Sequence, residues 1–147
     1  MAFETFDPVN LKIVVDGNII EGFAETMVSI SRPNPMWVSQ VGATGHVCRI
    51  KTNDFTTDVS ITLQQCSISN EALSSIVEDD EKINDGVFTI TIIYQGTTIL
   101  DSSSAYIEKM PDASWGNSPS DWEWTIKCAR AIYSLKKTSQ LTANLDD

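Results

Sequence analysis

The chain has 147 residues, and its 20 acidic against 10 basic side chains give a formal charge of −10. A chain of this length forms a single domain with an adequate core, so disulfides or structural metals are not needed for folding. An isoelectric point near 4.4 argues against a protein that grips nucleic acid by neutralising phosphates.

The sequence shows no signal for secretion, membrane insertion or disulfide bonding. Residues 1–8 lack the basic and the apolar regions of a secretory signal, and no apolar run approaches the ~20 residues of a membrane span. Cys48, Cys66 and Cys128 are an odd number without a paired motif, so we expect reduced thiols and a cytoplasmic origin.

Strands dominate the first half of the chain. The 16 Ile, 10 Val and 14 Thr residues of the whole sequence favour strands, because side chains branched at Cβ suit a pleated sheet. The segments expected to be strands are 11–15, 19–20, 26–30, 46–51 and 58–64. Asp16-Gly17 supplies a tight turn, and Val59, Ile61 and Leu63 alternate with polar residues as on a half-buried strand.

Residues 31–45 interrupt this pattern of strands. They contain two prolines early and two glycines late, and we expect them to form a long loop or extended arm between two strands. Loops of this length are uncommon in compact domains and usually have a function.

One helix and a second group of strands follow. Ser69 or Asn70 is expected to cap the helix, whose apolar stripe holds Leu73, Ile76 and Val77. The later segments are strands at 87–94, 97–100, 104–109 and 123–128, a loop at 112–120 and a polar tail at 136–147. Roughly eight strands and one helix predict a mostly β fold, a sandwich or barrel with one flanking α-helix.

No arrangement of residues indicates catalysis, a metal or a cofactor. His46 is the single histidine, and it would share a strand face with Cys48, but a closed zinc site needs four ligands. The acidic segment before Asp85-Gly86 fails as a calcium loop, because Ile occupies two of its ligand positions. Since a nucleophile elbow and a phosphate-binding glycine loop are also absent, we expect no catalytic residues, no metal and no cofactor.

The tryptophans indicate two kinds of contact. Trp122 and Trp124 alternate along one strand and are interpreted as core anchors. Trp37, beside Met36 in an otherwise polar segment, suits an anchor for another protein. A competing interpretation is a monomeric carbohydrate-binding β-sandwich that uses Trp37 and Trp115 as its sugar platform.

Charge is distributed unevenly along the chain. Nine acidic residues and one basic residue, Lys82, lie from Asp54 to Asp101, whereas Lys127 and Arg130 belong to a basic group elsewhere. Such asymmetry is compatible with head-to-tail association of copies, and it is equally compatible with an acidic solvated surface.

Several motifs follow one another in a specific order. They are Ile61-Thr62-Leu63-Gln64-Gln65, Ser69-Asn70-Glu71-Ala72-Leu73, Ala105-Tyr106-Ile107-Glu108-Lys109-Met110-Pro111-Asp112, Trp115-Gly116 and Trp122-Glu123-Trp124-Thr125-Ile126. Together they resemble the tail tube proteins of contractile-tailed bacteriophages over approximately residues 11–133. The blocks 107–112 and 123–126 are the most specific parts of this resemblance.

The resemblance implies a single tail tube domain over residues 1–147, with an N-terminal arm at 1–10, a contact loop at 31–45 and the tail at 136–147. It implies a non-enzymatic virion protein, assembled in the host bacterial cytoplasm, whose hexameric rings stack into the inner tube of a contractile tail. The partners would be copies of itself, the tail sheath protein, and the baseplate and tail terminator proteins. DNA would pass through without specific binding, and no membrane would be involved.

Two sets of site residues accompany this interpretation. The loop residues expected to contact the adjacent ring are Arg32, Asn34, Met36, Trp37, Val38 and Gln40. The polar residues expected to face the channel are Asp58, Ser60 and Thr62. The same superfamily leaves a second interpretation open, a tube-like protein of a secretion system or baseplate that passes proteins instead of DNA.

Overall fold

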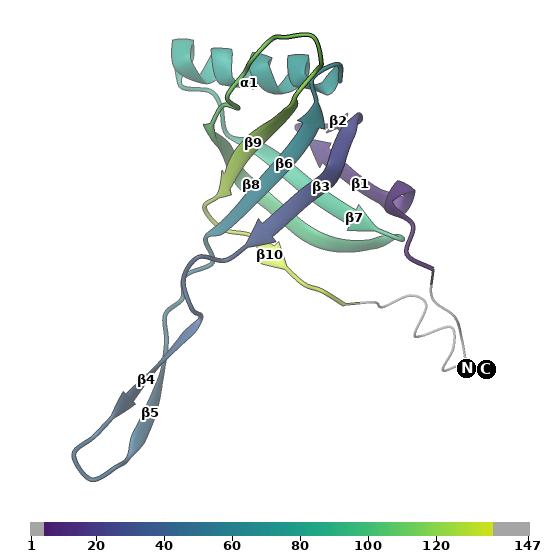
Figure 1. Cartoon of the computed structure of the whole chain (residues 1–147). Helices are drawn as coiled ribbons and strands as arrows, with labels where there is room; N and C mark the ends of the chain where they lie inside the picture. Colours follow the sequence, from purple (N-terminus) through teal and green to yellow (C-terminus); the bar gives the residue numbers. More distant parts are fainter. Residues whose placement is uncertain (1–4, 137–147) are drawn as a thin grey trace.

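The computed structural model describes residues 5–136, which form a curved sheet, a helix and a projecting hairpin (Figure 1). The strands are β1 (Leu11–Val15), β2 (Asn18–Ile19), β3 (Phe23–Ser31), β4 (Trp37–Val41), β5 (Val47–Lys51), β6 (Thr57–Gln64), β7 (Phe88–Tyr94), β8 (Thr97–Lys109), β9 (Asp121–Cys128) and β10 (Ile132–Tyr133). The helix α1 spans Ser69–Ile83, and a short 3-10 turn, η1, spans Pro8–Asn10. The expected mostly β fold with one flanking helix is confirmed. Residues 137–147 of the expected tail lie outside the described part.

The main sheet is antiparallel throughout and is held together by one long strand. Its order is β2-β1-β7-β8-β9-β6-β3, with β10 also paired to β8. The first part of β8 pairs with β7 and its last part with β9, and register shifts interrupt both pairings. Such irregularities bend a strand and increase its twist. The sheet therefore curls around its core, in agreement with the predicted sandwich or barrel.

The core lies inside this curl and follows the predicted alternation. Val59, Ile61 and Leu63 of β6 are fully buried, and the residues between them are half-exposed. On β9, Trp124 is the largest fully buried side chain, whereas Trp122 is only half-buried. The buried face predicted for β6 is confirmed, and on β9 Trp124 is a core anchor as predicted, whereas the same prediction for Trp122 is wrong.

The start of α1 corrects the sequence prediction, because neither Ser69 nor Asn70 caps the helix. Both residues lie within the first turn and are buried. Asn70 Nδ2 donates to the carbonyl of Gln64 (3.0 Å), and its Oδ1 accepts from Trp124 Nε1 (3.0 Å). Asn70, whose residue type favoured a cap in the sequence, instead links α1 to the sheet through its side chain. There it accepts the hydrogen bond of the buried Trp124 indole.

The connection from β2 to β3 packs tightly against the start of α1. Gly22 has a φ of +76°, and a Cβ there would lie 2.6 Å from the Ser67 side chain. We expect Gly22→Ala to lower the free energy of unfolding by about 2 kcal/mol, through left-handed backbone strain and this steric clash. Gly17 has a φ of +80° with open space around it, so Gly17→Ala measures the strain alone. Equal shifts of the urea midpoint in the two variants would contradict the clash.

Candidate functional site

A two-stranded hairpin projects from the body, and residues 33–53, which include it, are called the arm below (Figure 1). β4 and β5 pair with each other, from Trp37 opposite Lys51 to Val41 opposite Val47, and with no other strand of residues 5–136. Every residue of both strands is exposed. An isolated hairpin is marginally stable in water, so a hairpin with neither face buried on its own body is suited to bind another molecule.

Residues 31–45, predicted as a long loop or extended arm between two strands, contain a strand of their own. β4 lies within that range, and its strand character comes from aromatic and β-branched residues that suit a pleated ladder. Gly42 and Gly45 form the hairpin turn, where the amide of Gly42 donates to the carbonyl of His46 (2.8 Å). The prolines and glycines that suggested a loop therefore mark the two ends of a strand.

Arg32 holds the root of the arm against the body. Its guanidinium donates to the carbonyl of Ala131 (3.1 Å). The guanidinium carbon also lies 5.7 Å from the ring centroid of Phe55 and 5.9 Å from that of Tyr133, within the range of cation–π attraction. Arg32 is thus half-buried and bonded within its own chain, and its contact with an adjacent ring stays a prediction.

Asn34 also holds the root of the arm against the body, through Asp54. Its Nδ2 donates to the carboxylate of Asp54 (2.7 Å), and the amide of Thr56 donates to the second oxygen of that carboxylate (3.0 Å). Hydrogen bonds from Thr56 and Asn34 hold the pKa of Asp54 below its ordinary value. These bonds favour the ionised carboxyl, so they weaken as the pH falls through the lowered pKa.

The surface of the arm combines apolar and cationic side chains. Its large exposed apolar residues are Met36, Trp37, Val38, Val41, Val47 and Ile50. The guanidinium carbon of Arg49 lies 5.1 Å from the centroid of the Trp37 ring. From residue 33 to residue 53 the charged residues are Arg49 and Lys51, with no acid. Aromatic and Arg side chains are enriched where proteins bind one another.

Four predicted contact residues, Met36, Trp37, Val38 and Gln40, lie on the exposed arm. The residues that sequence reasoning missed are Val41 at the end of β4 and Val47, Arg49 and Ile50 on the returning strand β5. Their signal was available, since an apolar alternation continues on both sides of the glycine turn and acids are absent from the segment. The structure also places His46 at the turn and Cys48 in β5, and residues 5–136 contain no cluster of three potential metal ligands.

The predicted channel residues Asp58, Ser60 and Thr62 lie on one polar face of the sheet. They stand opposite Lys127, Thr125 and Glu123 of β9, in that order. Lys127 Nζ is 3.9 Å from Asp58 Oδ1 and 3.9 Å from a carboxylate oxygen of Glu108, so these ion pairs are loose and exposed. The structure brings the three predicted residues together, and what they face in an assembly stays a prediction.

The two borders of the main sheet are unpaired within the described residues. β3 ends the sheet on one side and β2 with β1 on the other, and no ladder joins them. A groove of about 520 Å³ lies between these borders, lined among others by Val9, Leu11, Phe23 and Met27. Val9 is 80% exposed. Unpaired strand borders are templates for pairing with another chain.

The structure separates the two tryptophans of the proposed sugar platform. Trp37 lies on the arm, whereas Trp115 belongs to the loop between β8 and β9, which lies at the end of the molecule that carries α1 (Figure 1). Trp115 is 75% exposed and meets Trp122 edge to face, with ring centroids 5.9 Å apart. Trp37 and Trp115 therefore do not form a joint platform in one subunit.

None of the helices in residues 5–136 is long and apolar enough to span a membrane.

The sequence is similar to one curated phage protein. No protein-family model matches the chain. The similar protein is named structural protein ORF10 of Pseudomonas phage KPP10, and it is 26% identical over 153 residues, which cover 95% of this chain and 88% of that protein.

Solved structures show the same fold in contractile injection particles. The tube-terminating cap of the anti-feeding prophage has a TM-score of 0.66 at 12% identity, covering 90% of this chain and 92% of its own. The sheath/tube terminator of the PVC extracellular contractile injection system has a TM-score of 0.66 at 13% identity, covering 90% and 98%. A chain of the PVC sheath-tube complex has a TM-score of 0.61 at 16% identity, covering 87% and 90%. The expected resemblance to this group of proteins is confirmed in the fold.

Proposed function

We propose that this chain is the inner tube subunit of a contractile tail, a non-enzymatic virion protein whose hexameric rings stack into a hollow tube. The observation that carries the proposal is the arm, a hairpin with all strand residues exposed and its root fixed to the body. The shared fold with proteins of contractile injection particles supports it. The similarity to a phage structural protein supports it as well.

The open sheet borders provide the contacts within a ring. Each copy has a free β3 border and a free border at β2 and β1, so one copy presents two different borders to its neighbours. Contacts between different surfaces generate a closed ring when the rotation per copy divides the circle. Pairing around the ring would cover backbone groups that are otherwise exposed and prone to aggregation.

The arm provides the contact between rings. β4 and β5 project away from the main sheet (Figure 1), so pairing of the sheet borders does not cover the exposed Trp37 and Val38. Burial of one large aromatic residue at the centre of an interface contributes about 2–4 kcal/mol. In a ring of six, this contact is repeated at every subunit, and the total is sufficient for a stable stack.

The polar face with Asp58, Ser60 and Thr62 is assigned to the channel. A conduit for DNA must not hold its cargo, and acidic or neutral side chains release no counterions when phosphates approach. The cation on the same face, Lys127, lies 3.9 Å from carboxylate oxygens of both Asp58 and Glu108, which offset its charge. Repulsion from the wall acts over ~8 Å at physiological salt. DNA therefore slides past this face without specific binding, and the external partners are the sheath, the baseplate and the tail terminator.

A second candidate function is the tube terminator itself. Two of the similar solved structures are a tube-terminating cap and a sheath/tube terminator. A terminator and a tube subunit share the ring, and they differ in whether the ring stacks further. A tube that passes proteins, in a secretion system or baseplate, would use the same contacts with a different cargo.

Electron microscopy of the purified chain over a range of concentrations tests the proposal. We expect six-fold rings that stack into tubes, with Asp58, Ser60 and Thr62 on the inner wall of the reconstruction. Single rings that never stack would favour the terminator instead. A chain that stays monomeric up to about millimolar concentration, near the local concentration in a tethered assembly, would contradict both. A ring with the Asp58 face on the outside would contradict the channel assignment alone.

A further inference from the structure

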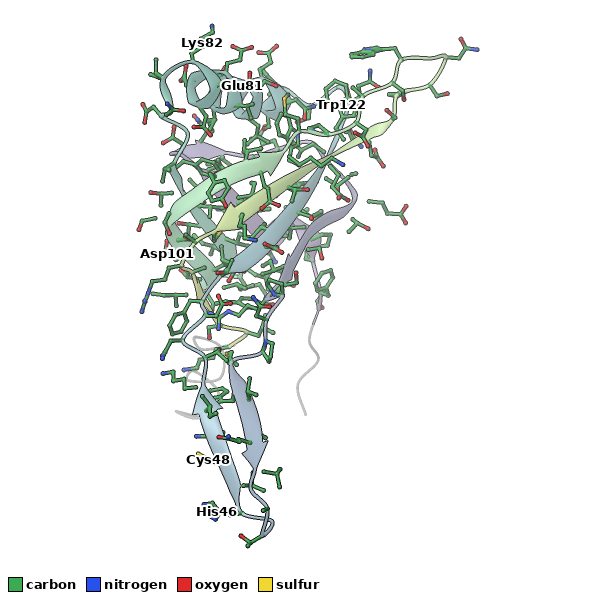
Figure 2. All side chains as sticks on the ribbon, turned by 90° about the vertical axis from the view of Figure 1, so that its left-hand side faces the viewer. His46, Cys48, Glu81, Lys82, Asp101 and Trp122 are labelled. Carbon is green, nitrogen blue, oxygen red and sulfur yellow. The ribbon has the colours of Figure 1, made fainter. Side chains whose placement is uncertain are left out.

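The arm and the acidic helix lie at opposite ends of the molecule. Figure 2 shows Glu81 and Lys82 on α1 at one end, and His46 and Cys48 on the arm at the other. Two different surfaces at opposite ends allow copies to add head to tail along one axis, which is an open, heterologous arrangement. The end that carries α1 is therefore the place to look for the surface that receives the arm.

A groove of about 450 Å³ is present at that end, between the second half of α1 and the end of β8. Its lining combines apolar and acidic side chains: Val77, Asp80, Glu81, Ile107, Glu108 and Met110. Lys109 is the one cation among the lining residues. Within residues 5–136, Asp80 and Glu81 form no ion pair. The groove thus offers unpaired carboxylates beside apolar surface, and its volume suits a few side chains.

One face of the arm has the complementary composition. Trp37 is opposite Lys51 and Ser39 is opposite Arg49, and residues two apart on a strand share a face. Trp37, Arg49 and Lys51 therefore point to the same side. Neither Arg49 nor Lys51 forms an ion pair in the described part of the chain. This face presents an aromatic ring with two cations, whereas the other face carries the uncharged Val38, Gln40, Cys48 and Ile50.

We propose that the groove between α1 and β8 receives the arm of a subunit in the next ring. Arg49 and Lys51 meet the carboxylates of Asp80 and Glu81, and Trp37 covers the apolar floor at Val77 and Met110. The inference rests on the proposed function, because it names the surface that the arm contacts. Complementary charges at such a contact fix its register and exclude wrong pairings. In this arrangement the acidic side chains of α1 are complementary in charge to the arm, which carries cations and no acids.

A charge swap tests the proposal. Arg49→Glu and Glu81→Arg should each raise the concentration needed for stacking by about tenfold or more, and the double variant should return to within about threefold of wild type. Glu71→Arg is the matched control, since Glu71 lies in the first turn of the same helix and outside the groove lining. It should stack like wild type. Thermal unfolding of each variant confirms that the body is intact.

The outcomes separate this proposal from the proposed function. If the wild type forms tubes but Glu81→Arg stacks normally, or the double variant is not rescued, the groove does not receive the arm. The proposal that the chain is a tube subunit would still stand. A wild-type chain that never stacks would overturn both. Rescue of stacking in the double variant would support the pairing. It would be established if salt also weakens the stacking of the wild type more than that of a variant in which both Arg49 and Lys51 are replaced by uncharged residues.

Discussion

Replacing residues 37–51 by a two-residue Asn-Gly turn is expected to abolish ring stacking and leave the body folded. The amide of Thr52 donates to the carbonyl of Met36 (3.0 Å), so the two chains are already side by side where the new turn would close them. Asn-Gly adopts the tight hairpin turn that this spacing requires. All residues removed are exposed, and the free energy of unfolding should change by no more than about 0.5 kcal/mol.

The loss of stacking should be complete at concentrations where the wild type forms tubes. The truncation removes Trp37, Arg49 and Lys51 together, and each contact is repeated around the ring. Urea unfolding followed by tryptophan fluorescence checks the body, and electron microscopy checks assembly. Trp37→Ala is the milder companion variant and should weaken stacking without removing it. Long tubes from the truncated chain, or a truncated chain that no longer unfolds cooperatively, would show that the arm has another role.

The sequence predicted most of the body because its signals there were local. β6 alternates between buried and half-exposed residues, and the turns at Asp16-Gly17 and Gln95-Gly96 have positive φ values, which Gly adopts without strain and Asp tolerates. The segment 104–109, predicted either to continue the strand at 97–100 or to form another one, is the end of the single strand β8. The two possibilities stayed open because the polar residues 101–104 interrupt the apolar alternation that marks a continuous strand.

The arm was only partly predictable. Its position in the sequence was found from the prolines and glycines, and its second strand was predicted at 46–51. The first strand, β4, was not predicted, because the prolines before it and the glycines after it are typical of loops and turns. The roles of Arg32 and Asn34 were not predictable either, since their partners, Ala131 and Asp54, are 99 and 20 residues away. Such long-range contacts depend on the finished fold and leave no spacing in the sequence.

The largest effect on stability is expected where α1 is tied to the sheet by Asn70. This side chain is buried, and it bonds both a backbone carbonyl of Gln64 and the indole of Trp124, which is 1% exposed. Asn70→Ala leaves the buried indole N–H of Trp124 without its partner. The carbonyl of Gln64 loses the Asn70 side chain but still accepts from the amide of Ser67 (3.0 Å). An unsatisfied buried polar group costs about 1–3 kcal/mol, and a lost hydrogen bond to a group that keeps another partner costs about 1 kcal/mol, so we expect a total loss of about 3 kcal/mol.

A double-mutant cycle with Trp124→Phe isolates the bond itself. Trp124→Phe removes the donor and leaves Asn70 Oδ1 unpaired, so the two single costs should exceed the cost of the double variant by about 1–2 kcal/mol. Trp122→Phe is the matched control, because the Trp122 Nε1 has no hydrogen-bond partner among the described residues. Its cost should be smaller, and its coupling to Asn70→Ala close to zero. Additive effects of Asn70→Ala and Trp124→Phe in urea unfolding would contradict the bond. A strong coupling would instead show that the helix carrying the acidic groove is held to β9 by this contact, so that Asn70→Ala also loosens the surface proposed to receive the arm.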